Sequence, residues 1–242
     1  RSFKKLGTKA YSMDGKARLS LLHNIFHMDT REQLQFDWSW LLPSGLNTKD
    51  FILIGVLSAL MWVICMIIST VMSVAGPVTN ICYPSGVAIV NGIPMMLLLA
   101  KVPKRGVFTI SSVIQGILLM LVGCFWVVSL LFIIGGVVCD LLVLRGGKIT
   151  MGAMKIAFAV FSGFFQLGYL FPFVFMKEAF TDVMLGNGIS QEFIDSLFGV
   201  TAGVMPVVIV AVGLICGFIG ATIGQRVLKK HFIKAGLVSI KK

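Results

Sequence analysis

Long runs of apolar residues, separated by short polar links, dominate this sequence from residue 51 to residue 224. The first run, from Phe51 to Ala75, contains no charged residue. A helix needs about 20 apolar residues to cross the roughly 30 Å hydrocarbon core of a bilayer, so this run is long enough to span a membrane. The pattern predicts an all-α fold, an integral membrane bundle of six transmembrane helices at residues 51–75, 87–100, 107–122, 125–144, 152–176 and 201–224.

Two of the links have distinct patterns. The segment from Gly76 to Gly86 contains two prolines and two glycines, which predicts a turn-rich, non-helical loop. Residues 177–200 are acidic, and their apolar residues flank the sequence Gly186-Asn187-Gly188. This second pattern predicts two short amphipathic helices joined by a flexible turn, able to lie across the outer mouth of the protein.

The distribution of charge predicts the topology. Basic residues occur at Lys49 and in the segments 101–105, 145–148 and 226–242, whereas the acidic link 177–200 falls on the other side of the predicted bundle. Cytoplasmic loops of membrane proteins carry an excess of Lys and Arg, so both termini are expected in the cytoplasm. The net charge of +11 is thereby explained without a nucleic-acid partner, and we expect a multi-pass protein of the cell membrane.

The same pattern divides the chain into three parts. Residues 1–46 form a basic cytoplasmic or interfacial extension, residues 47–237 the six-helix membrane domain, and residues 238–242 a basic tail. Within the extension, residues 17–26 suit either an amphipathic helix lying on the membrane surface or a partly disordered tail.

Composition excludes several classes of function. With 57% hydrophobic and 13% charged residues, the chain is no soluble globular domain. The five cysteines are scattered singly without C-x-x-C spacing, and no histidine falls in a predicted external segment, so neither a disulfide framework nor a metal site is expected. Phosphate-loop, zinc-protease, nucleophile-elbow and dinucleotide motifs are absent from the sequence. We therefore expect neither enzymatic activity nor a cofactor of its own.

One acidic residue lies inside an apolar run. Asp140 is near the end of the fourth predicted span, where a lone carboxylate in hydrocarbon is energetically costly. Arg145, Lys101 or the N-terminus of a neighbouring helix would provide a partner. Structural pairing is favoured over a proton relay, because no second intramembrane carboxylate is present to complete a relay.

Small residues mark two helix faces. Gly55 and Ala59 lie one helical turn apart in the first span, so another helix can approach their backbone closely, although such pairs also serve ordinary packing. The last span carries a longer set, which predicts close helix packing: Gly213, Gly217, Gly220, Ala221 and Gly224.

Three further segments carry a resemblance to a known family. They are the sequence from Asn91 to Val102 (NGIPMMLLLAKV), Asp140 before a glycine-containing link, and the tail motif Leu228-Lys-Lys-His-Phe. Over about residues 46–237 the chain resembles the Trep_Strep family, whose members are regarded as substrate-binding S components of energy-coupling factor (ECF) transporters.

The resemblance implies a mechanism and partners. The S component binds its substrate near the outer face, topples within the membrane and releases the substrate inward. A transmembrane T component and two ATPase subunits, which use the ATP, supply the energy. The resemblance places Gly55 and Ala59 against the T component, with Gly55 replacing the Ala usual at the first position.

Polar or amphipathic side chains near the predicted outer helix ends are the candidate substrate-binding residues: Asn80, Tyr83, Trp126, Gln166 and Tyr169. An aromatic-rich mouth suits a larger amphipathic ligand such as a tetrapyrrole or siderophore. The rival reading is a non-transport membrane scaffold or assembly factor that recruits partners through residues 1–46.

Overall fold

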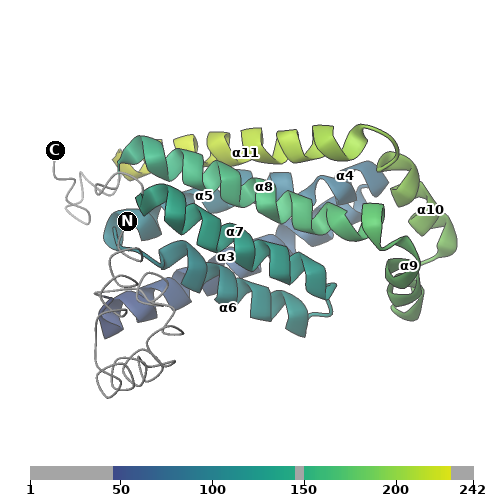
Figure 1. Ribbon diagram of the computed structural model, residues 1–242, viewed down its shortest axis with the longest axis horizontal. Coiled ribbons are helices and arrows are strands. Elements are labelled where there is room, and N and C mark those ends of the chain that lie inside the picture. Colours follow the sequence, from purple (N-terminus) through teal and green to yellow (C-terminus); the bar gives the residue numbers. More distant parts are fainter. Residues whose placement is uncertain (1–45, 145–149, 230–242) are drawn as a thin grey trace, which may run out of the picture. The chain divides into compact units, whose positions relative to one another are not determined.

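The computed structural model describes residues 46–144 and 150–229; most of these residues are helical, and there is no strand among them. Residues 1–45 of the predicted extension, the 145–148 link with Arg145, and the tail beyond residue 229 lie outside the described residues. Figure 1 shows the long helices side by side, with α9 and α10 across one end. The helices are α3 (Thr48–Val74), α4 (Pro77–Ile81), α5 (Tyr83–Lys101), α6 (Val107–Leu121), α7 (Trp126–Leu144), α8 (Met151–Phe175), α9 (Lys177–Gly186), α10 (Gln191–Val200) and α11 (Met205–Val227).

Four of these helices are long and apolar enough to cross a membrane, namely α3, α5, α8 and α11. The all-helical prediction is confirmed, and so is the prediction of a membrane protein with several apolar helices. The predicted count of six spans is not confirmed, because only these four described helices are candidate membrane spans by length and composition. Helix α6 has 15 residues, which at 1.5 Å per residue gives about 22 Å, less than the hydrocarbon thickness. The described apolar part of α7 is likewise shorter than 18 residues.

The first predicted loop is largely helical, which corrects the expectation for residues 76–86. Helix α4 begins at Pro77, and α5 begins at Tyr83 with Pro84 in its first turn. Proline suits the first turn of a helix, because its φ is already helical and the N–H that it lacks would have no partner there. The helix of the second span therefore starts at Tyr83, within the predicted loop. Its helix also continues through Pro94.

The predicted pair of short helices in the acidic link is confirmed as α9 and α10. Each has one side buried, with Phe180 on α9 and Leu197 on α10 packed into an apolar cluster with Ile81 and Phe173. The two helices thus close over the end of the bundle where α4 and the last part of α8 lie.

Glycines bring α11 into backbone contact with α5. A Cβ atom placed on Gly220 would lie 2.2 Å from the carbonyl oxygen of Ala88, and one placed on Gly92 would lie 2.2 Å from the carbonyl carbon of Gly220. A Cβ on Gly224 would lie 2.3 Å from the oxygen of Gly92. The close packing predicted for the small-residue face of α11 is confirmed, and its partners are α5 and α8.

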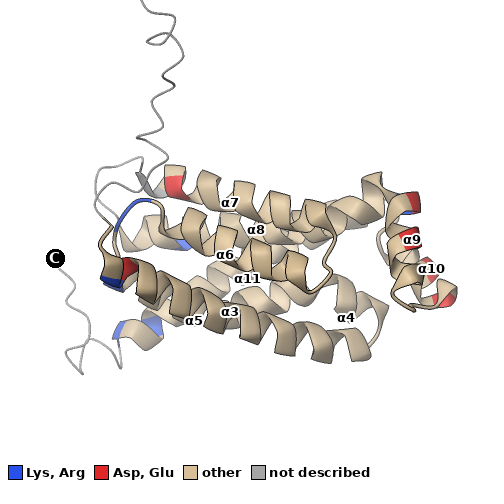
Figure 2. Ribbon diagram, turned by 90° about the horizontal axis from the view of Figure 1, so that it is seen from below, with Lys and Arg blue, Asp and Glu red and all other residues tan. Residues whose placement is uncertain are grey.

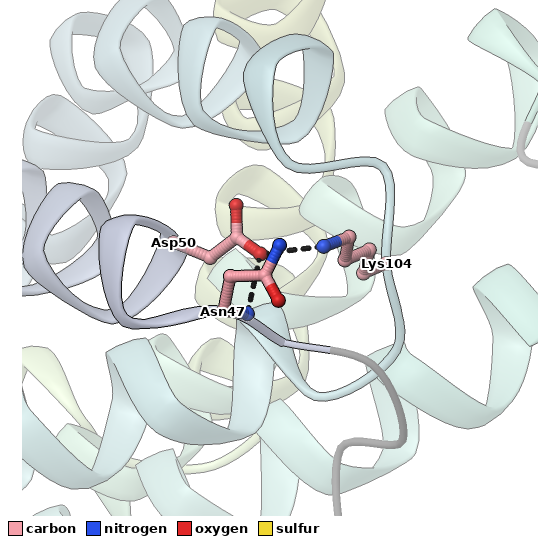
Figure 3. A network of polar contacts seen from close by, with 3 residues as sticks. All are labelled: Asn47, Asp50 and Lys104. Carbon is pink, nitrogen blue, oxygen red and sulfur yellow. Dashed lines mark hydrogen bonds and ion pairs between the residues drawn. The ribbon is translucent and has the colours of Figure 1, made fainter.

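Charged residues gather at the two ends of the bundle (Figure 2). Acids of α9 and α10 lie at one end, whereas α3 begins and α5 ends at the other. There the Asp50 carboxylate accepts a hydrogen bond from the Asn47 backbone N–H at 2.8 Å and forms an ion pair with Lys104 at 2.5 Å (Figure 3). These contacts fasten the basic α5–α6 link to the start of α3. The cytoplasmic location of this end stays a prediction.

Candidate functional site

Asp140 caps the N-terminus of α6. Its Oδ2 accepts hydrogen bonds from the backbone N–H of Thr109 at 2.8 Å and from the Thr109 hydroxyl at 2.6 Å, while its Oδ1 accepts from the Phe108 N–H at 3.2 Å. The first N–H groups of a helix have no partner within the helix, and the helix dipole favours an anion there. Of the three partners considered for Asp140, the described contacts therefore involve a neighbouring helix N-terminus. This arrangement makes the carboxylate a link between α7 and α6.

Four of the five predicted substrate-binding residues lie together. The Tyr169 hydroxyl donates to Asn80 Oδ1 at 2.7 Å, and the rings of Tyr83 and Tyr169 meet edge to face with their centroids 4.7 Å apart. Gln166 is fully buried one turn before Tyr169 on α8. Trp126 shares none of these bonds or ring contacts: it begins α7, is 51% exposed, and its ring lies beside that of Phe125.

The polar atoms of this group are engaged within the protein. Gln166 Oε1 accepts from the Ser85 hydroxyl at 2.8 Å, and its Nε2 donates to the Ile81 carbonyl oxygen at 2.9 Å. Asn80 Nδ2 also donates, to the Ser73 hydroxyl at 2.8 Å. These bonds hold α4 and the first turn of α5 against α8. They form a polar layer, defined by Asn80, Ser85, Gln166 and Tyr169, beneath helices α9 and α10.

A cavity lies among α3, α5, α6, α7 and α8, and none of the five predicted residues lines it. The centre of a water molecule can move through about 30 Å³ of this space. A single buried water requires about 10–15 Å³, so the cavity is larger than a one-water site. Its lining is mainly apolar and includes five aromatic side chains: Trp62, Phe132, Phe158, Phe161 and Phe165.

Three of the lining residues have uncharged polar side chains, namely Asn91, Gln115 and Ser162. Asn91 is 6% exposed and donates from Nδ2 to the Met61 carbonyl oxygen at 3.0 Å. Only the amide nitrogen can donate to a carbonyl, so this bond fixes which way the Asn91 amide is turned. Gln115 is held by its own turn of helix, through Nε2 to the Ser111 hydroxyl at 3.0 Å.

Two buried polar atoms of the lining residues lack a partner. Within the described part of the chain, Trp62 Nε1 and Asn91 Oδ1 form no hydrogen bond. The indole N–H can only donate and the amide oxygen can only accept, so the two atoms offer complementary functions. Leaving such a group unpaired costs about 1–3 kcal/mol. A bound molecule that pairs with them would recover that energy, and the cavity is therefore the candidate functional site.

The prediction from sequence missed these residues for an identifiable reason. The predicted residues are those near the outer helix ends, whereas Asn91 and Gln115 lie near the middle of α5 and α6. A polar side chain at the centre of an apolar run is itself a signal, because burying it without a partner is costly. That signal would have identified both residues.

The predicted partner interface lies on an open face of α3. A Cβ atom on Gly55 would have no atom within 4 Å, and Ala59 is exposed. Large apolar neighbours on this face are also exposed, with Val56 at 61% and Leu60 at 47%. Helix α3 buries 28% of its most apolar stretch, the smallest share among the four spanning helices. Gly55 itself is half-buried, but the direction in which a side chain would project is open.

Comparison with known proteins identifies the family. A family model described as "Hypothetical bacterial integral membrane protein (Trep_Strep)" matches residues 48–234. The chain therefore belongs to the Trep_Strep family of bacterial integral membrane proteins, and it is a multi-pass protein of the cell membrane. No curated protein and no solved structure matches the chain.

Proposed function

We propose that this Trep_Strep protein is the substrate-binding S component of an ECF-type importer. It binds a small molecule from outside the cell and releases it inward, with energy supplied by ATP hydrolysis in partner subunits. The observation that carries the proposal is the cavity among five helices, lined by residues with an unpaired buried donor, Trp62 Nε1, and an unpaired buried acceptor, Asn91 Oδ1. Small-molecule sites are typically apolar cavities with a few polar groups of this kind.

The arrangement around the cavity supports a route from the end covered by α9 and α10. Pro84 and Phe165 line the cavity. The residues that follow them in sequence, Ser85 and Gln166, are hydrogen-bonded to each other in the polar layer. In this proposal the polar layer lies between the cavity and helices α9 and α10. A substrate entering from that end requires this layer to open. In this proposal, four of the predicted substrate-binding residues control substrate entry and contact the substrate only while the layer is open: Asn80, Tyr83, Gln166 and Tyr169.

The size of the cavity bears on the substrate. A tetrapyrrole or siderophore is much larger than a space in which a water centre can move through about 30 Å³. Binding such a ligand would require the surrounding helices to separate. The cavity as described favours a smaller molecule, and we propose one of about a single ring.

The open face of α3 supports a partner within the membrane. Gly55 leaves its backbone accessible, and Ala59 adds only a methyl group one turn further on. A helix of a T component could approach there and gain dispersion contacts that larger side chains would prevent. Toppling in response to ATP hydrolysis by two ATPases would then be transmitted to the substrate-binding subunit through α3.

Copurification tests this proposal. The full chain, tagged and purified from bacterial membranes, should carry a T component and two ATPases. Gly55→Leu and Ala59→Leu should each remove these subunits while leaving a bound small molecule in place, because the cavity is lined by other residues. Val71→Leu is the matched control, since Val71 is 64% exposed near the opposite end of the same helix. That variant should retain the partners.

Three results would contradict the importer. They are a wild-type chain that purifies without ATPases, either leucine variant retaining them, and Val71→Leu losing them equally. Deletion of residues 1–46 distinguishes the importer from a non-transport scaffold, which would recruit its partner through these residues. All of them except Leu46 lie outside the described residues. A transport subunit keeps its ligand after this deletion, whereas a scaffold loses its partner.

A further inference from the structure

We propose that the molecule bound in the cavity is uncharged and presents one hydrogen-bond acceptor and one donor, as a cyclic amide does. Its carbonyl oxygen accepts from Trp62 Nε1–H, and its N–H donates to Asn91 Oδ1. This inference rests on the proposed function, because it names the chemical class of the substrate at the same site.

The absence of charge follows from the lining. Among the described residues that surround the cavity there is no Asp, Glu, Lys, Arg or His. Moving an isolated charge out of water into such a site is very costly, because no opposite charge compensates for the lost hydration. A carboxylate or ammonium substrate is therefore excluded by the same lining that accepts a neutral one.

The need for both an acceptor and a donor follows from the two unpaired atoms. The Asn91 amide cannot turn over to offer its nitrogen, because Nδ2 already donates to the Met61 carbonyl oxygen at 3.0 Å. That carbonyl belongs to the peptide bond joining Met61 to Trp62, so the Asn91 amide lies beside the backbone from which the indole projects. A ligand with only an acceptor would leave Asn91 Oδ1 unpaired, and one with only a donor would leave Trp62 Nε1 unpaired.

The remaining lining favours a flat apolar body. Four phenylalanine rings surround the space, and Phe132 lies close to two of the others, with ring centroids 4.6 Å from Phe161 and 4.9 Å from Phe165. Aromatic faces and edges pack well against a planar ring. Together with the small volume, this indicates a single-ring amide.

The test uses 2-pyridone as the probe and N-methyl-2-pyridone as its matched partner, which keeps the carbonyl and lacks the N–H. Calorimetry on the purified full chain in detergent should show that the wild type binds 2-pyridone about 3- to 10-fold more tightly than N-methyl-2-pyridone. This is the difference that one neutral hydrogen bond predicts. In Asn91→Leu this preference should fall to about one. In Trp62→Phe both probes should lose affinity by about the same factor.

Ser129→Ala is the matched control variant. Ser129 is buried and does not line the cavity. Its Oγ is the third buried side-chain polar atom without a hydrogen-bond partner in the described residues. It should keep wild-type affinity for both probes. The comparison of the two probes on the wild type alone keeps the test decisive if a variant fails to fold.

Several outcomes would overturn the inference. They are equal affinity of the wild type for both probes, tighter binding of benzoate than of 2-pyridone, a preference that survives in Asn91→Leu, and a cavity that takes up water only. These results would leave the importer standing if the chain still copurified with ATPases and a different bound molecule. Loss of the ATPases and of any bound molecule would instead remove the proposed function itself.

Discussion

The crossing of α5 and α11 provides a sharp stability prediction, because it depends on a hydrogen atom at Gly220. In Gly220→Ala the new Cβ would lie 2.2 Å from the Ala88 carbonyl oxygen and 2.9 Å from the Ile89 Cα. Both are backbone atoms, which no side-chain rotation can move. The two helices must therefore separate, and the dispersion contacts along their interface weaken.

Gly55→Ala is the matched control for this substitution. Its Cβ would meet nothing within 4 Å, although Gly55 is also a glycine in the interior of a spanning helix. Both variants gain helix propensity, by up to about 1 kcal/mol. That gain cancels in the difference between them, which isolates the clash. Overpacking of this kind costs about 1–3 kcal/mol, so we expect Gly220→Ala to be less stable than Gly55→Ala by that amount.

Thermal unfolding in detergent measures the difference. A thiol-reactive dye reports unfolding directly, because Cys65 and Cys139 are free and buried in the folded chain. At about 2–4 °C per kcal/mol for a chain of this size, Gly220→Ala should melt several degrees below Gly55→Ala. Equal melting temperatures, or a more stable Gly220→Ala, would refute the backbone contact between α5 and α11.

Three further substitutions test the polar contacts by the same unfolding assay. Asp140→Asn replaces one acceptor of the α6 cap with an NH₂ group that faces donors, and should lower stability by about 1.5–3 kcal/mol; an unchanged melting temperature would show that the cap is unimportant. Tyr169→Phe removes the hydrogen bond to Asn80, costs about 1 kcal/mol and should speed hydrogen exchange in α4; unaltered exchange would argue against the polar layer. Ser129→Ala removes a buried hydroxyl without a partner and should leave stability unchanged or raise it by up to about 1 kcal/mol; a clear loss would reveal a hydrogen bond that the structure does not contain.

Much of the fold could be predicted from the sequence, because helix length and hydrophobic pattern are properties of a single segment. The charge-free run in α3, the glycines of α11 and the amphipathic pattern of α9 and α10 each determine a local structure. The segment before α5 could not be read in this way. Proline in such a segment predicts a break between helices, whereas Pro77 and Pro84 lie in the first turns of α4 and α5.

The site was harder to predict, because whether a polar group is available depends on its neighbours in space. Gln166 and Tyr169 are polar residues near a helix end, as expected of a binding site, yet each is paired with another part of the chain. Asn91 lies at the middle of an apolar helix, which the sequence shows, but one half of its amide is paired and the other is not, which the sequence does not show. No pattern within a single segment contains that information.

Native mass spectrometry of the full chain, purified from its own membrane, tests the central claim that this cavity binds a small molecule. We predict that the wild type and Ser129→Ala each carry the same non-lipid molecule, and that Asn91→Leu, which removes the Oδ1 acceptor, carries clearly less of it. A wild-type protein without any bound molecule, or an Asn91→Leu variant that retains the molecule undiminished, would contradict the claim.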